Sequence, residues 1–174
     1  MKHTLFKPHI KSALLVVSLA TAAIAYPAIN AFAAFATADF QVQITITNAC
    51  AISGVNDLDF GSQGSLAAAT ASTSTFSVNC TTDLPYTIGL NAGTGAGATV
   101  ANRLMTGPSS ATVAYSLYQD ASHLTVWGDS IGTDTVAGTG TGTDVLYTVF
   151  GQVPAQTTPA AGTYSDTITI TVTF

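Results

Sequence analysis

Two segments, one near each end of the part after residue 33, alternate regularly between apolar and polar residues, and Asp166 is the one exception. In the segment 39–47 the apolar positions are Phe40, Val42, Ile44 and Ile46. In the segment 163–174 they are Tyr164, Ile168, Ile170, Val172 and Phe174. A period of two places neighbouring side chains on opposite faces of a β-strand. The pattern therefore predicts two strands with one apolar face each.

Shorter apolar or alternating runs lie between these segments and are separated by Gly, Pro, Asp and Asn. They cover residues 51–53, 58–60, 76–80, 85–90, 99–105, 113–118, 125–127 and 146–153. Thr, Val, Ser, Gly and Ala dominate this region, whereas the good helix formers are scarce. Short strands at such intervals favour a one-domain, all-β sandwich. Residues 128–144 are rich in Gly and Thr and are predicted to form one long loop or a decorated hairpin.

The first 33 residues have the pattern of a secretory signal peptide. Three lysines (Lys2, Lys7 and Lys11) precede the apolar run 13–25, and the motif Ala31-Phe32-Ala33 fits a signal-peptidase site. We expect residues 1–33 to be removed, so that the mature chain begins at Ala34. Cleavage after Ala36 and a retained membrane anchor are the alternatives.

The residues after this segment carry an unusual charge. They contain nine aspartates, one arginine (Arg103) and one histidine (His123), with no lysine or glutamate, which gives a formal charge of −8. A single cation cannot neutralise phosphates, so nucleic-acid binding is excluded. An anionic membrane surface would repel the chain for the same reason.

Two cysteines, Cys50 and Cys80, both lie in the part expected to be exported. An even count in an exported chain predicts one disulfide formed in an oxidising compartment. A zinc site is the weaker alternative, because it needs four ligands and His123 is the only histidine left to join two thiolates.

No set of residues forms a convincing catalytic or metal site. His123 lies in a turn-like Asp-Ala-Ser-His sequence, which explains it without an acid–base role. Asp57 and Asp59 could form a carboxylate pair, but alternate positions of one strand account for them equally well. Calcium ligands at Asp129, Asp134 and Asp144 match no known calcium-binding spacing. We therefore expect neither an enzyme nor a cofactor or metal.

The segment 38–47 has two possible roles that its periodicity cannot separate. It could be the first strand of its own sandwich. Alternatively, it could insert into the sheet of a neighbouring subunit, as in donor-strand complementation. Both roles demand the same alternation of apolar and polar residues.

Several ordered blocks resemble the spore coat protein U domain family, which includes pilin subunits of archaic chaperone–usher pili. The resemblance covers essentially the whole chain after the signal peptide. Its carriers are the blocks 44–50 (ITITNAC), 58–61 (LDFG), 76–80 (FSVNC), 113–120 (VAYSLYQD), 149–154 (VFGQVP) and 162–174 (GTYSDTITITVTF).

The resemblance implies an incomplete immunoglobulin-like β-sandwich completed by a strand from another protein. A periplasmic chaperone would lend that strand, and at the outer-membrane usher the next subunit's N-terminal segment would replace it. On this basis residues 34–47 are the donor segment, with a boundary uncertain by several residues, and 48–174 are the pilin domain. The donor side chains would be Phe40, Val42, Ile44 and Ile46. The acceptor edge, which would first contact the chaperone, would be Ile168, Ile170, Val172 and Phe174, and Cys50 and Cys80 match the family's disulfide.

The expected function is therefore that of a structural subunit of a homopolymeric surface pilus that supports adhesion and biofilm formation. The strand predicted at 163–174 would leave an unpaired edge, which is an aggregation hazard unless another strand covers it. Two alternatives remain from the sequence. One is a self-contained secreted adhesin or carbohydrate-binding domain, and the other is a structural protein of a spore or cyst coat.

Overall fold

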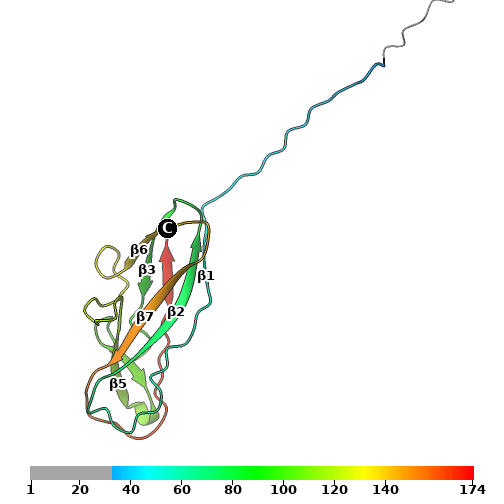
Figure 1. Ribbon diagram of the computed structural model, residues 1–174. Helices are drawn as coiled ribbons and strands as arrows, with labels where there is room; N and C mark the ends of the chain where they lie inside the picture. Colours follow the sequence, from blue (N-terminus) through cyan, green and yellow to red (C-terminus); the bar gives the residue numbers. More distant parts are fainter. Residues whose placement is uncertain (1–32) are drawn as a thin grey trace, which may run out of the picture. The chain divides into compact units, whose positions relative to one another are not determined.

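The computed structural model describes residues 33–174, so the predicted signal peptide, apart from Ala33, lies outside the described residues. The chain divides into two compact units, Met1–Gln43 and Ile44–Phe174. The described part of the first unit contains no helix or strand, and the second unit holds every strand (Figure 1). Within residues 33–174 no helix is long and apolar enough to cross a membrane.

Within residues 33–174, eight strands form two antiparallel sheets. The five-stranded sheet has the order β1 (Cys50–Ser53), β2 (Thr70–Cys80), β7 (Val145–Val153), β5 (Thr112–Tyr118) and β4 (Arg103–Thr106). The three-stranded sheet has the order β6 (Val136–Thr139), β3 (Pro85–Leu90) and β8 (Ile170–Thr173). A single 3-10 turn, η1 (Pro108–Ser110), joins β4 to β5. The prediction of an all-β sandwich is confirmed.

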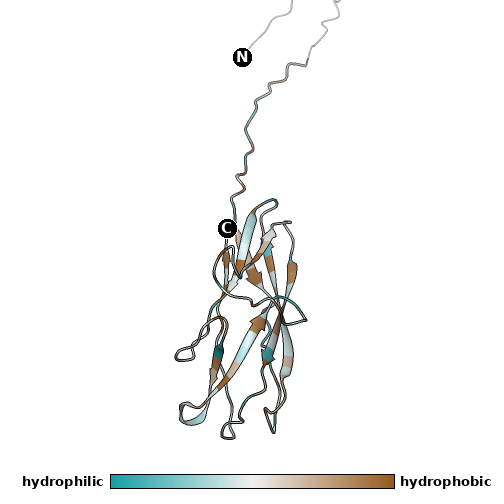
Figure 2. Ribbon diagram, turned by 90° about the vertical axis from the view of Figure 1, so that its left-hand side faces the viewer, coloured by the Kyte–Doolittle hydropathy of each residue, from teal (hydrophilic) through white to brown (hydrophobic). Residues whose placement is uncertain are grey.

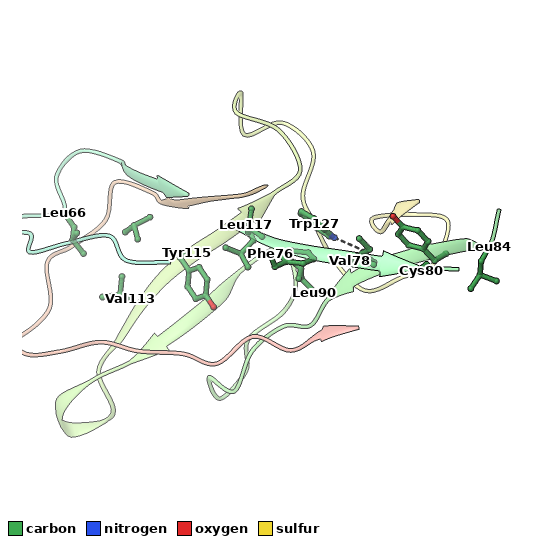
Figure 3. Packing of buried hydrophobic residues seen from close by; sticks show 14 residues of the cluster. Leu66, Phe76, Val78, Cys80, Leu84, Leu90, Val113, Tyr115, Leu117 and Trp127 are labelled. Atoms are coloured by element: carbon green, nitrogen blue, oxygen red, sulfur yellow. Dashed lines mark hydrogen bonds between the residues drawn. The ribbon is translucent and has the colours of Figure 1, made fainter. Parts of the chain in front are cut away.

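The core lies between the two sheets and takes side chains from both. Apolar and polar residues alternate along the strands (Figure 2), and the apolar ones form a continuous row (Figure 3). Phe76 packs against Trp127 and Tyr147, with ring centroids 5.9 and 5.7 Å apart. The Trp127 Nε1–H donates to the Ile88 carbonyl at 2.9 Å, which satisfies the indole in the core.

Arg103 at the start of β4 is fully buried. Its guanidinium donates to four backbone carbonyls, those of Asn91, Val100, Leu90 and Trp127, at 2.7–2.9 Å. Burial lowers the pKa of Arg103, and nearby Tyr115 and aspartates oppose that shift. The side chain therefore joins β4 to the end of β3 and to the segment that carries Trp127.

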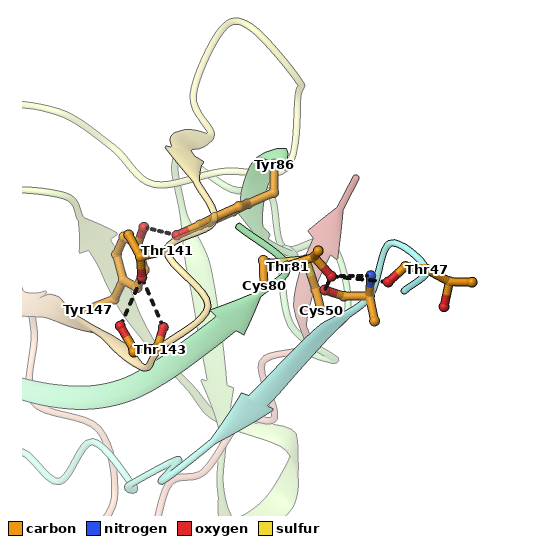
Figure 4. The surroundings of a disulfide bond; sticks show 9 residues. Thr47, Cys50, Cys80, Thr81, Tyr86, Thr141, Thr143 and Tyr147 are labelled. Atoms are coloured by element: carbon orange, nitrogen blue, oxygen red, sulfur yellow. Dashed lines mark hydrogen bonds between the residues drawn. A yellow bond between two sulfur atoms is a disulfide. The ribbon is translucent and has the colours of Figure 1, made fainter. Parts of the chain in front are cut away.

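Cys50 and Cys80 form a disulfide between the paired strands β1 and β2 (Figure 4). Thr81, which follows β2, binds the residues that precede β1. Its Oγ1 accepts from the Ala49 N–H at 3.0 Å and donates to the Thr47 carbonyl at 3.2 Å. The start of β1 is thus tied covalently and by hydrogen bonds to the end of β2.

We expect the double variant Cys50→Ala/Cys80→Ala to lose about 3 kcal/mol in its free energy of unfolding, since the disulfide restricts a 30-residue loop of the unfolded chain. Urea denaturation of the oxidised wild type and the double variant measures the difference. Adding a reductant should lower the stability of the wild type alone. Equal stability of the two proteins under oxidising conditions would contradict the prediction.

Four sequence-based expectations about strands are wrong. Residues 39–47 form no strand, because no strand of residues 33–174 pairs with them and a lone strand lacks ladder hydrogen bonds. The interpretation of 38–47 as the first strand of its own sandwich is therefore wrong. The strand predicted at 163–174 is confined to β8, because β3 ends at Leu90 opposite Ile170. Residues 58–60 and 125–127 are not strands either, although Val126 forms one bridge to Tyr118.

The segment 128–144 contains the strand β6, which the sequence analysis did not locate because the segment is rich in Gly and Thr. β6 pairs with β3 from Pro85 to Ile88. At Gly138 a Cβ atom would lie 2.6 Å from the Tyr86 ring, so only glycine allows this close approach.

Candidate functional site

A groove opens into the core along one side of the sandwich. It has a volume of about 460 Å³ and lies between the segment 55–60 and the segment 164–170. Its floor consists of core side chains from both sheets: Phe76, Leu90, Met105, Tyr115, Leu117 and Val149. The groove therefore opens onto the buried region where the two sheets meet.

A second hollow of about 680 Å³ continues the first one. The two share Leu58, Phe60, Met105 and Tyr164. The second hollow extends to Leu66, Val113 and Val153 at the far end. We call the combined feature the strand groove, because it is elongated and its floor is apolar.

The first wall of the strand groove follows β1 in the chain. Leu58 and Phe60 are partly buried and pack against the core, whereas Asp57 and Asp59 are exposed. A Cβ atom at Gly151 would lie 2.7 Å from Leu58 Cδ1, so the glycine in β7 makes room for this wall. Asn56 joins the wall to β2, because its backbone N–H donates to the Thr75 carbonyl at 3.0 Å and its side-chain amide donates to the Thr75 hydroxyl at 3.0 Å. The Ser74 hydroxyl donates to the Asn56 carbonyl.

The opposite wall leads into β8 and is held by Asp166. The Asp166 Oδ1 accepts from the Thr94 N–H at 2.7 Å, the Thr94 hydroxyl at 2.8 Å and the Thr167 N–H at 2.8 Å. Its Oδ2 accepts from the Tyr115 hydroxyl at 2.8 Å. Burial tends to raise the pKa of Asp166, but the hydrogen bonds from Thr94, Tyr115 and Thr167 outweigh it and lower the pKa. The carboxylate thus fastens the wall to β5 and to the loop after β3.

This wall should loosen in acid. A carboxyl whose folded pKa is depressed stabilises the fold above its unfolded pKa of about 3.9, and that stability is lost as the pH falls through the folded pKa. Asp166→Asn should cost roughly 1 kcal/mol at pH 7 and should reduce the fall in stability below pH 4. Urea denaturation at pH 7, 4 and 3 measures both effects. An unchanged pH dependence in the variant would contradict the assignment.

Two strands at the ends of the sheets contribute side chains to the strand groove, Met105 of β4 and Ile170 of β8, and β1 precedes the first wall in the chain. Within residues 33–174, β1 pairs only with β2, and β8 pairs only with β3. Each therefore has one edge whose backbone groups are unpaired by another strand of the described chain. Unpaired edges and an exposed core are the features to which an added β-strand binds.

Two of the four predicted acceptor residues line the strand groove, and the other two do not. Ile168 and Ile170 line the strand groove. Val172 packs against the core further along β8, and Phe174 is 57% exposed and lies beyond the strand. Five further residues of the groove were not predicted from the sequence: Leu58, Phe60, Met105, Tyr115 and Asp166. The first wall could have been predicted from the alternation of polar and apolar residues in Asp57-Leu58-Asp59-Phe60.

The predicted donor residues lie in a segment without secondary structure. Phe40, Val42, Ile44 and Ile46 are 85%, 83%, 82% and 72% exposed. Four large apolar side chains at alternate positions are thus left in water, which is unusual for a soluble chain.

The candidate catalytic and metal residues do not come together. His123 lies in a turn with a positive φ of 55°, and its ring packs edge-on against Tyr118 at 5.1 Å. Asp134 accepts from the Ser130 N–H, whereas Asp144 accepts from Asn79 at 3.0 Å. Among the described residues no three potential ligands form a metal-binding group.

Comparisons with known proteins agree with this geometry. The model of the Spore Coat Protein U domain matches residues 36–171. The chain is 32% identical to Protein U of Myxococcus xanthus over 179 residues, which covers 95% of this chain and 98% of that protein.

A solved structure shows the same fold. It is the crystal structure of the CsuC–CsuE chaperone–tip adhesion subunit pre-assembly complex from archaic chaperone–usher Csu pili of Acinetobacter baumannii. The TM-score is 0.56 at 23% identity, over 75% of this chain and 41% of that one. The sandwich is accordingly immunoglobulin-like. The matching proteins are structural rather than enzymatic, so the chain is not an enzyme. On its sequence and its fold, this chain belongs to the Spore Coat Protein U domain family.

Proposed function

We propose that the chain is a structural subunit of an archaic chaperone–usher pilus and that its subunits polymerise by donor-strand exchange. The observation that carries the proposal is the strand groove, which opens onto core side chains between the segment 55–60 and the segment that leads into the end strand β8. The same chain supplies a segment with the alternating apolar pattern of a strand and no partner of its own. The groove of one subunit and the segment of another are complementary in chemistry.

The energetics favour a stable junction. Burying Phe40, Val42, Ile44 and Ile46 in a neighbour's groove would contribute roughly 6–12 kcal/mol, before the costs of ordering and association are subtracted. Backbone hydrogen bonds to a free strand edge add to this and fix the register. The junction should therefore resist detergent.

The roles of the partners follow from this mechanism. Residues 1–33 would direct export, 34–47 would be the donor segment and 48–174 the acceptor domain. A periplasmic chaperone would cover the groove before assembly, and an outer-membrane usher would exchange it for the next identical or related subunit. The product would be a surface pilus that supports adhesion and biofilm formation.

The alternatives are weaker. A self-contained adhesin would cover its core with its own strands, and the strand groove does not fit that expectation. The 32% identity to Protein U of Myxococcus xanthus keeps a coat protein as a second candidate. Assembly that proceeds without an usher and yields a coat layer rather than fibres in electron micrographs would favour the coat.

The test is gel electrophoresis of periplasmic and surface protein from cells that co-express the chain with a chaperone and an usher. A ladder that survives SDS, collapses on boiling and needs residues 34–47 is the expected result. A variant in which residues 34–47 are replaced by a Gly/Ser sequence of the same length separates loss of the apolar pattern from loss of chain length, and it should also give no ladder. A stable monomer without a ladder in any sample would refute the proposal.

A further inference from the structure

The exposed charge of residues 33–174 is entirely negative. This part of the chain has no lysine, and its one arginine, Arg103, is fully buried. Its nine aspartates therefore have no lysine and no exposed arginine in this part of the chain with which to pair. Any charged group that approaches from another protein therefore meets an acidic surface.

Two of these aspartates stand on the rim of the strand groove. Leu58 and Phe60 pack inward, so the alternation places Asp57 and Asp59 outward, and both are exposed. Asp57 borders the first hollow and Asp59 borders the second. On the opposite wall both oxygens of Asp166 are already used by hydrogen bonds within the chain. Asp57 and Asp59 are thus the carboxylates best placed to meet a bound strand.

The chain's own donor segment does not complement this rim. Residues 34–47 contain Asp39 and no lysine or arginine, so the α-amino group left by cleavage before Ala34 would be the segment's one cation, five residues before Asp39. A second copy that inserts its segment brings a further carboxylate to an acidic groove. At about 0.1 M salt the screening length is about 10 Å, so charges on a bound strand act on the rim mainly when they lie within that distance. Self-assembly therefore works against a weak repulsion.

Resting on the proposed function, we infer that the strand groove favours as its first occupant a partner strand that carries Lys or Arg beside its alternating apolar residues. The apolar residues fill the groove, and the cations pair with Asp57 and Asp59. Salt then acts on the two steps in opposite directions. It weakens capture of the cationic strand and relieves the repulsion that opposes insertion of the chain's own segment.

Two synthetic peptides test the inference, both with acetylated and amidated ends. One has the sequence of residues 38–47, and the other carries Gln41→Lys and Gln43→Lys. The full exported chain is refolded from denaturant in the presence of each peptide, and the SDS-resistant ladder reports how much self-assembly the peptide prevents. At 20 mM NaCl the lysine peptide should block the ladder at a concentration about three- to tenfold lower than the peptide with the natural sequence requires. This difference in potency should vanish at 300 mM NaCl.

The double variant Asp57→Asn/Asp59→Asn should abolish the greater potency of the lysine peptide at low salt. Asp83→Asn/Asp144→Asn removes the same charge from exposed sites outside the groove and should preserve it. Equal potency of the two peptides, or equal effects of the two double variants, would overturn the inference. If the ladder without peptide is normal in that case, the proposed function is unaffected. No ladder without peptide and no capture of either peptide would instead refute the proposed function.

Discussion

Replacing Arg103 by alanine is expected to lower the free energy of unfolding by about 3–5 kcal/mol. The side chain is fully buried, and its guanidinium donates to four backbone carbonyls. Alanine would leave those carbonyls without donors in a cavity. A buried acceptor that loses its partner costs about 1–3 kcal/mol, so the loss is large even if water enters the cavity. Urea denaturation followed by tryptophan fluorescence measures it, because Trp127 is in the core.

Two matched variants separate charge from geometry at this position. Arg103→Lys keeps the charge but not the planar fork, and it should satisfy at most three of the carbonyls. Arg103→Met keeps most of the volume and removes every donor. We expect stability to fall in the order wild type, Lys, Met. A loss below 1 kcal/mol for Arg103→Met would show that the carbonyl bonds contribute little.

Composition could not reveal the role of Arg103. A lone arginine in an acidic chain suggests a surface residue, because arginine is rarely fully buried. Its burial depends on carbonyls of Leu90, Asn91, Val100 and Trp127, which only the fold brings together. The strands β2, β3, β5 and β7, in contrast, were predictable, because their alternation reflects one buried face.

The strand groove was only partly predictable for a similar reason. Ile168 and Ile170 could be assigned to an acceptor edge from their alternation and the family resemblance. The opposite wall could not, since Leu58 and Phe60 form no strand and are placed by their packing against Gly151. Asp166 was given no role of its own, and its contact with Tyr115 spans 51 positions of the chain. Contacts of that range leave no local pattern.

Residues 39–47 show where periodicity alone misleads. Their alternation is as regular as that of β8, yet only β8 has a partner strand in the described chain. A period of two indicates that a segment can pair as a β-strand. It does not indicate whether the partner strand belongs to the same chain or to another molecule. The proposed function places that pairing between subunits, which makes a charge on the apolar face the most sensitive test.

Ile44→Asp is expected to abolish the SDS-resistant ladder. In the proposed junction Ile44 fills the apolar groove of a neighbour, and a carboxylate there would be buried without a partner, at a cost of several kcal/mol. In the separate subunit Ile44 is 82% exposed, so the substitution should leave the unfolding free energy of the acceptor domain within about 0.5 kcal/mol. Assembly and stability are therefore affected independently.

Thr45→Asp is the matched control, because it adds the same charge one residue away on the polar face of the donor strand. Its side chain would point into water at the junction, so the ladder should persist with at most a modest loss of long species. Gel electrophoresis of boiled and unboiled samples compares the two variants directly. Equal loss of the ladder in both would show that charge at any position of the segment blocks assembly. A normal ladder in Ile44→Asp would exclude this face from the junction, and with it the proposed donor register.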